Sequence, residues 1–172
     1  MKWHEIVSTW FGLGKSSFMP GTIGSLGAFP LFYLSVMTSE TAYEAKMTML
    51  FLIVILSIVG YFAIRLYHNA TGIIDDQSIV VDEVIGQMVT LAIAYEWIGS
   101  FITKINLIPP DTGISMSLVY IFLAGFLPFR FFDITKPFYI SLIDRYWKNA
   151  VGVILDDILA GIAAALVFYI FR

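Results

Sequence analysis

Apolar stretches that approach the length of a membrane-spanning helix recur along most of this chain. About 20 apolar residues suffice for an α-helix to cross the hydrocarbon layer. Four stretches reach or approach that length: residues 46–64, 84–102, 114–132 and 155–171. A fifth, residues 19–37, is weaker because three glycines and two prolines interrupt it. The pattern predicts an all-α, polytopic membrane bundle with four to five spans, in which the weak segment either crosses with distortion or re-enters.

Two shorter segments are predicted to be interfacial helices. Trp3, Val7, Trp10 and Phe11 recur at the spacing of one helical face. Along residues 137–148, bulky apolar side chains alternate with charged ones. Because no internal repeat or flexible linker divides the chain, we expect residues 1–172 to form a single domain.

Lysine and arginine are distributed unevenly between the two sides that five spans would define. One side holds seven of them and the other three: Lys2, Lys15, Arg65, Arg130, Lys136, Arg145 and Lys148 against Lys46, Lys104 and Arg172. The side rich in cations is expected to be cytoplasmic. Residues 68–81 and 133–152 are separated by two spans, so they lie on the same side whatever the weak segment does. Residues 12–25 join them there only if that segment crosses.

Composition supports a membrane protein and narrows its chemistry. Hydrophobic residues make up 59% of the chain and charged residues 13%, against about 45–50% and about 25% in soluble domains. With no cysteine and only two histidines, any metal would be held mainly by carboxylates, which suit Mg²⁺ or Mn²⁺. The net charge of −3 leaves no basic face, so a nucleic-acid partner is not expected.

Acidic residues gather at the ends of the predicted spans. A carboxylate inside the bilayer costs about 2.5–3.5 kcal/mol, so an acid at such a position usually has a reason to be there. Asp82 and Glu83 open one span, Asp133 closes another, and Asp156 and Asp157 open the last. The structural alternative for the two pairs is simple helix capping at the membrane edge.

Cations and small residues accompany the acids. Arg130 and Lys136 stand three residues before and after Asp133, so on a continuing helix the three would share a face. Such cations can hold a phosphate while a carboxylate ligates a metal, although a snorkelling arginine with a local salt bridge is the alternative. Residues 20–25 combine glycines and hydroxyls that can present backbone N–H groups to an anion, or serve only as a close-packed loop.

Together these features predict a cytoplasmic-facing pocket lined by carboxylates from three segments, with cations and a glycine-rich turn beside them. Hydrophobic walls and hard-metal ligands favour a phosphorylated lipid head group as the ligand. An ion-coupled transporter, with buried acids as cation or proton sites, is the alternative from another functional class.

Four motifs resemble those of a known family. They are PGTIGS (20–25), SIVVDEVIGQ (78–87), FRFFDITKP (129–137) with IDR (143–145), and GVILDDILAG (152–161). Their order and spacing are similar to those of the phosphatidylglycerophosphatase A family, and the resemblance covers nearly the whole chain. It implies a bacterial, Mg²⁺-dependent membrane phosphatase that converts phosphatidylglycerophosphate to phosphatidylglycerol. Ile23 and Tyr139 depart from the family's usual tryptophan and second proline.

The resemblance also implies roles for individual residues. Mg²⁺, or Mn²⁺ in its place, would be held by Glu83, Asp133, Asp156 and Asp157, with Asp82 a further ligand or the acid–base group. Phosphate would be bound by Lys15, Gly21, Thr22, Gly24, Ser25, Arg130 and Lys136, and catalysis would rest on Asp82, Asp133 and Lys136. Either a metal-activated water or an aspartate would be the nucleophile. The partners implied are the lipid substrate and the bacterial inner membrane; the oligomeric state is not implied.

Overall fold

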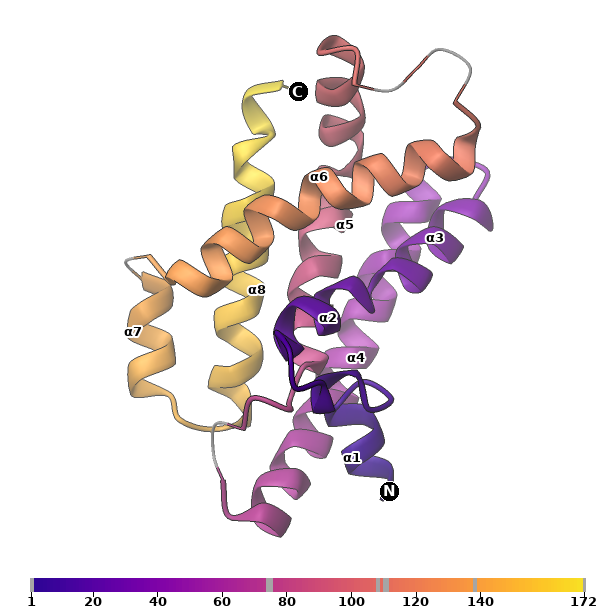
Figure 1. The fold of residues 1–172 in the computed structure, drawn as a ribbon. Coiled ribbons are helices and arrows are strands. Elements are labelled where there is room, and N and C mark those ends of the chain that lie inside the picture. The colour runs from indigo at the N-terminus through magenta and orange to yellow at the C-terminus, as the bar shows by residue number, and fades with distance from the viewer. Residues whose placement is uncertain (1, 74–75, 108, 110–111, 138, 172) are drawn as a thin grey trace.

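The computed structural model describes residues 2–73, 76–107, 109, 112–137 and 139–171, and the regular elements in this part of the chain are all helical (Figure 1). In order they are α1 (Trp3–Ser8), the 3₁₀ helix η1 (Leu13–Lys15), α2 (Pro20–Leu26), α3 (Phe29–Met37), α4 (Ala42–Thr71), α5 (Val81–Lys104), α6 (Ile114–Thr135), α7 (Tyr139–Tyr146), α8 (Ala150–Val167) and the 3₁₀ helix η2 (Tyr169–Phe171). Among the described residues, four helices are long and apolar enough to cross a membrane: α4, α5, α6 and α8 continued by η2. The predicted all-α membrane bundle is confirmed.

Helix α5 forms the centre of the bundle and packs against α4, α6 and α8. Its second and third turns, from Val84 to Leu91, have almost no exposed side chain. Helix α6 lies obliquely across α5 and α8 (Figure 1). Because α5 is covered on several sides, it tolerates polar residues that a lipid-facing helix would have to keep at its ends.

Helices α5 and α8 approach so closely that only glycine fits at the crossing. A Cβ atom on Gly86 would lie 2.6 Å from the backbone oxygen of Asp157, and one on Gly161 would lie 2.4 Å from the oxygen of Gly86. Small residues that let two backbones meet are the usual device for packing helices in membranes. The Thr90 hydroxyl lies 3.2 Å from the backbone oxygens of both Gly86 and Gly161, which ties the two helices together at this level.

The weak apolar segment is a broken pair of helices rather than one long helix. Helix α2 ends at Leu26 and α3 begins at Phe29, and the pair runs from the middle of the molecule towards the end where α4 begins (Figure 1). The break exposes backbone carbonyl groups, which hydrocarbon cannot satisfy. Trp10 donates a hydrogen bond from Nε1 to the Gly27 oxygen at 3.0 Å, so a side chain of the protein satisfies this carbonyl group at the break.

Helices form in both segments that were predicted to be interfacial, but the first is shorter than its apolar spacing suggested. Helix α1 ends at Ser8, and the backbone turns left-handed at Trp10 and Phe11 (φ 44° and 57°). Trp10 therefore leaves the face shared by Trp3 and Val7 and packs against the α2–α3 break instead. Helix α7 connects the last turn of α6 to α8, as expected for residues 137–148.

Candidate active site

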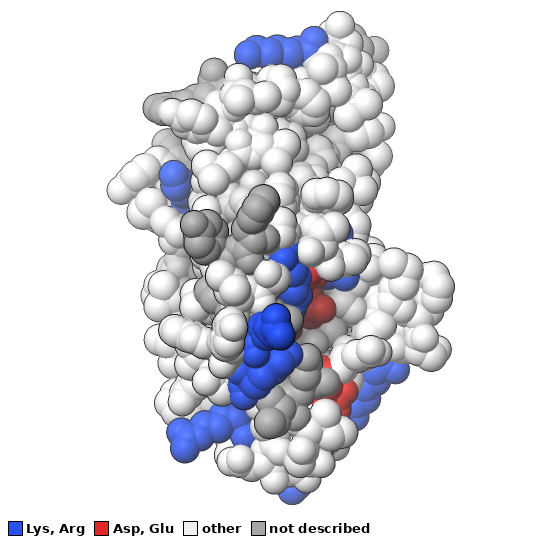
Figure 2. Space-filling model, turned by 90° about the vertical axis from the view of Figure 1, so that its left-hand side faces the viewer, with Lys and Arg blue, Asp and Glu red and all other residues white. Residues whose placement is uncertain are grey.

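A cavity of about 330 Å³ lies where the first turns of α2, α5 and α8 meet the last turns of α6. Both segments that the span count placed on one side, residues 68–81 and 133–152, contribute to its wall, and so does the start of α2. Its lining comprises Met19, Pro20, Gly21, Thr22, Asp76, Gln77, Ile79, Asp82, Glu83, Arg130, Asp133, Lys136, Trp147, Lys148, Gly152, Val153, Asp156 and Asp157. Figure 2 shows acidic atoms in a hollow of this face, with lysine and arginine atoms beside them.

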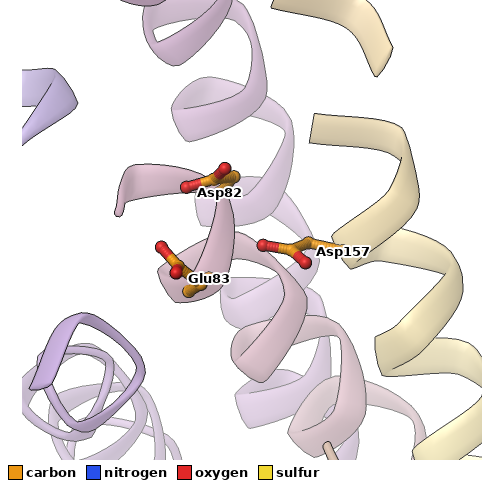
Figure 3. A group of neighbouring side chains, drawn as sticks. All are labelled: Asp82, Glu83 and Asp157. Carbon is orange, nitrogen blue, oxygen red and sulfur yellow. The ribbon is translucent and has the colours of Figure 1, made fainter. Parts of the chain in front are cut away.

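Three carboxylates from two helices converge in this cavity. Asp82 and Glu83 come from the first turn of α5, and Asp157 comes from α8 (Figure 3). One oxygen of each lies within 4.8 Å of the others. Asp82 and Asp157 are 8% and 4% exposed, so water screens their charges poorly.

Two atoms of this trio show that it suits a cation. Asp82 Oδ1 and Glu83 Oε2 are buried, and neither has a hydrogen-bond partner among the described residues. Unpaired carboxylate oxygens at such a depth are costly unless a proton or a metal cation joins them. An all-oxygen donor set is what Mg²⁺ and Mn²⁺ prefer, so the residues present fit a divalent ion of this kind.

The two other predicted metal ligands are paired with cations. Asp133 accepts a hydrogen bond from Arg130 within α6, and Asp156 lies 2.5 Å from Lys136 Nζ. Asp156 and Asp157 point to different neighbours because adjacent residues on a helix project about 100° apart. Both are buried in the second turn of α8, which begins at Ala150 and is capped by Asn149, so the alternative that they cap the helix is wrong. That Asp133 and Asp156 ligate a metal stays a prediction.

Lys136 reaches the site by a route that differs from the one its spacing predicts. Helix α6 ends at Thr135, and Lys136 is its C-cap with a left-handed backbone (φ 40°). The expectation of a shared helical face is therefore confirmed for Arg130 and Asp133, which pair within α6, and wrong for Lys136. Pro137 disfavours the α conformation in the residue before it, and the resulting turn directs the lysine across to Asp156 on α8.

The glycine-rich motif is helical and not a turn in front of a helix. Pro20 is the first residue of α2, and Gly21 and Thr22 line the cavity. A Cβ atom on Gly21 would lie 2.3 Å from Glu83 Oε1 and 3.1 Å from an Arg130 nitrogen, so a larger residue would require the ends of these side chains to shift. Ser25 lies outside the cavity lining and accepts a 3.3 Å hydrogen bond from Arg130, which orients the guanidinium.

Two further predicted phosphate-binding residues, besides Ser25, lie away from the cavity wall. Gly24 packs against Val80, where a Cβ atom would come within 2.5 Å of the valine Cβ, so its visible role is close packing of α2 on α5. Lys15 is exposed in η1 and does not line the cavity. The structure therefore gives no support to the prediction that Lys15 binds phosphate in this cavity.

Several lining residues were not among the predicted site residues, and three of them, Asp76, Trp147 and Lys148, bring a charged or large aromatic side chain to the cavity wall. Trp147 and Lys148 immediately precede Asn149, whose side chain caps α8 by accepting hydrogen bonds from Val151 and Gly152. The cap fixes the path of the chain over the cavity. The sequence signal that could have predicted this cap is Asn149 shortly before the last apolar stretch, with Gly152 three residues later.

Asp76 is held in place by a small hydrogen-bond network. Ser78 donates its backbone N–H to Asp76 Oδ1 at 2.9 Å, and the Tyr67 hydroxyl donates to Oδ2 at 3.1 Å. Partial burial by itself would raise the pKa of Asp76, but these hydrogen bonds outweigh it, so the pKa lies below its ordinary value of 3.8. An ionised carboxylate therefore anchors the chain that leads into α5.

Comparison with known proteins decides the family. The sequence family described as Phosphatidylglycerophosphatase A matches residues 6–172. This chain belongs to the phosphatidylglycerophosphatase A family. The matched residues include all four motifs identified in the sequence.

Individual relatives agree with this assignment. A protein of Escherichia coli named Phosphatidylglycerophosphatase A is 31% identical over 97% of this chain and 81% of its own length. One of the same name from Haemophilus influenzae is 29% identical, over 96% and 86%. A Bacteroides thetaiotaomicron protein, named "Putative phosphatidylinositol-3-phosphatase", is 29% identical over 97% and 92%. No solved structure matches the chain significantly.

Proposed function

We propose that this protein hydrolyses the terminal phosphate monoester of phosphatidylglycerophosphate, releasing phosphatidylglycerol and inorganic phosphate. Family membership over residues 6–172 supports the activity. The observation that carries it is the convergence of three carboxylates with Arg130 and Lys136 in one cavity at an end of the membrane-spanning helices. An anionic lipid head group beside the bilayer is the ligand that this arrangement suits best.

We propose Mg²⁺ as the cofactor, held by Asp82, Glu83 and Asp157. The set inferred from sequence was Glu83, Asp133, Asp156 and Asp157, with Asp82 a further ligand or the acid–base group. The present proposal makes Asp82 a ligand, and metal binding by Asp133 and Asp156 stays a prediction. The buried oxygens without hydrogen-bond partners support the choice. A divalent ion bound there supplies positive charge to the phosphate and makes water more acidic.

The protein's own cations would bind and orient the phosphate. Arg130 can offer two N–H groups to a phosphate, and Lys136 offers a point charge. Each is now paired with a carboxylate, Asp133 and Asp156 respectively, which holds it at the cavity wall before substrate arrives. Hydrolysis forms a bond from a water oxygen to phosphorus and breaks the bond to the glycerol oxygen, which takes up a proton.

We further propose that the cavity faces the cytoplasm of a bacterium, with the helices in the inner membrane. Most of the lysines and arginines counted from the sequence lie in segments at the cavity end of the bundle, and the positive-inside rule assigns such an end to the cytoplasm. Impermeant labelling of cysteines introduced at Ser78 and Asn149 tests the orientation, because the chain has no native thiol. Labelling of both in intact cells would contradict it.

Phosphate release tests the activity. The purified protein in lipid–detergent micelles should release phosphate from phosphatidylglycerophosphate, lose that activity in EDTA and regain it with Mg²⁺ or Mn²⁺. Full activity in a metal-free preparation would contradict the metal assignment. No release under any condition would favour the transporter alternative. Phosphatidylinositol 3-phosphate, suggested by the name of the Bacteroides relative, serves as a comparison substrate and should turn over more slowly.

A further inference from the structure

A second cavity, also of about 330 Å³, lies next to the first, between the last turns of α4 and the start of α8. It is lined by three basic side chains, Arg65, His68 and Lys148, together with two asparagines. None of its described lining residues is acidic. This charge differs from that of the catalytic cavity, where carboxylates predominate, and it suits an anion that needs no metal.

Lys148 joins the two cavities, because its side chain lines both. A ligand with two negative groups a short distance apart could therefore place one in each cavity and share this lysine. Phosphatidylglycerophosphate has this form: a terminal phosphate monoester and a phosphate diester are separated by one glycerol.

An apolar groove continues from the second cavity along α4 and α8. It has a volume of about 390 Å³, and its walls include Ile58 and Phe62 of α4 and Ile154 and Ile158 of α8. Tyr61 and Val151 line both the groove and the second cavity, so the two are continuous. The groove thus runs from a cationic site into the apolar part of two membrane-spanning helices, which is the shape of a site for an amphiphile with an anionic head.

We propose that these connected spaces bind one phosphatidylglycerophosphate molecule. Its terminal phosphate lies in the catalytic cavity, its diester phosphate lies beside Arg65, His68 and Lys148, and an acyl chain lies in the groove between α4 and α8. This assignment rests on the proposed function. It also explains selectivity, since a lipid whose phosphate is attached directly to diacylglycerol would place that phosphate in the second cavity, away from the carboxylate trio.

The first test measures lipid binding without turnover. Phosphatidylglycerol keeps the diester phosphate and both chains, whereas diacylglycerol keeps only the chains. Native mass spectrometry of the detergent-solubilised protein should show retained phosphatidylglycerol in preference to diacylglycerol. Arg65→Gln should lower this retention about tenfold, the loss expected for one charge-assisted contact. Lys2→Gln, which removes an exposed positive charge next to α1, is the control and should retain the lipid as the parent protein does.

The second test uses turnover. Ile58→Trp fills the groove and should raise the KM for phosphatidylglycerophosphate about tenfold with little change in kcat, because lost binding of the chain is uniform through the reaction. Val54→Trp is the matched control. It lies one turn away on α4, is similarly exposed (57% against 55%) and does not line the groove.

The outcomes separate this inference from the proposed function. Equal retention of phosphatidylglycerol by the parent protein and Arg65→Gln, with both folded, would overturn the diester site, whether or not the protein is a phosphatase. Equal KM values for Ile58→Trp and Val54→Trp would overturn the groove. Selective lipid retention without any phosphate release would instead keep the lipid site and reject the phosphatase.

Discussion

The two ends of the α5–α8 helix pair are held together by opposite kinds of contact. At one end Phe101 of α5 packs against Phe168 and Phe171, with ring centroids 5.7 and 4.5 Å apart, and Trp97 meets Tyr169 at 5.4 Å. At the other end, Asp82 and Glu83 face Asp157. Aromatic packing stabilises the fold through buried apolar area and ring–ring contact, whereas buried like charges oppose folding. The same helix pair could have been closed by apolar residues throughout, so the acidic end is explained by chemistry and not by stability.

The close crossing at Gly86 and Gly161 lies between these two ends. It fixes how near α8 comes to α5 just beyond the acids, and therefore how near Asp157 comes to Asp82 and Glu83. The separation of the carboxylates is set by backbone contact, which is stiffer than side-chain contact. Changes at the acidic end should therefore affect activity more than folding, and changes at the crossing should affect folding.

The largest effect is expected at the acidic end. Asp157→Asn keeps the size of the side chain but removes the charge that a divalent ion needs, so kcat should fall by about 10²–10³. Thermal stability should be unchanged or higher, because a repulsive buried charge is lost. Glu96→Gln, in the exposed half of α5 near the aromatic end, is the control. If Glu96→Gln lowered kcat as much, the contrast between the two ends would fail.

A smaller loss is expected from Lys136→Met. Removing one charge-assisted contact to phosphate should cost about 1.5–3 kcal/mol, or one to two decades in kcat/KM. The Mg²⁺ concentration for half activation should change little, because a cation does not ligate Mg²⁺. Separate titrations of substrate and Mg²⁺ check this, with Lys104→Met at the opposite end of α5 as the control. A change confined to the Mg²⁺ titration would contradict a role in phosphate binding.

The glycine crossing is expected to govern stability. Gly86→Ala places a methyl group 2.6 Å from a backbone oxygen and should lower the free energy of unfolding by about 1–3 kcal/mol. Gly99→Ala, in the same helix, meets nothing nearer than 3.7 Å and should be neutral or stabilise by about 0.5–1 kcal/mol. Denaturant unfolding in detergent compares the two. Similar free energies of unfolding for the two variants would show that the close approach of α5 and α8 at Gly86 is not needed for stability.

The smallest effect is expected at Asp76. Its pKa is lowered in the folded protein, so its stabilising contribution is present above pH 3.8 and is lost as pH falls through the folded pKa. Asp76→Asn should therefore be less stable by under about 1 kcal/mol near neutral pH. Thermal unfolding of both proteins as a function of pH should show the difference shrinking under acid conditions. If the difference in stability grew as pH fell, the pKa of Asp76 would not be lowered by folding, and the prediction would be wrong.

Sequence predicts the long helices and the grouping of the acids well, because both depend on simple quantities. Apolar length defines α4, α5, α6 and α8, and counting spans places residues 68–81 and 133–152 on one side. The partner of each charged side chain depends on backbone turns, which the spacing of residues in the sequence does not reveal. Lys136 pairs with Asp156, twenty residues away, because α6 ends one residue earlier.

The same limit applies to the second cavity. Arg65 and Lys148 are more than eighty residues apart in sequence, and neither belongs to a recognisable motif. They come together because α4 and α8 pack side by side, which apolar periodicity alone does not specify.

The hydrogen bond from Trp10 to Gly27 bears on the order in which the protein assembles. A broken helix pair cannot be left in lipid with its carbonyl groups exposed, so α2 and α3 become stable only after protein surrounds them. We therefore expect the N-terminal segment, although synthesised first, to settle after the four long helices have packed, when α1 and Trp10 dock. Completion of the cavity wall by Gly21 and Thr22 then coincides with the final step of folding, and a partly assembled bundle exposes its carboxylates without a complete phosphate site.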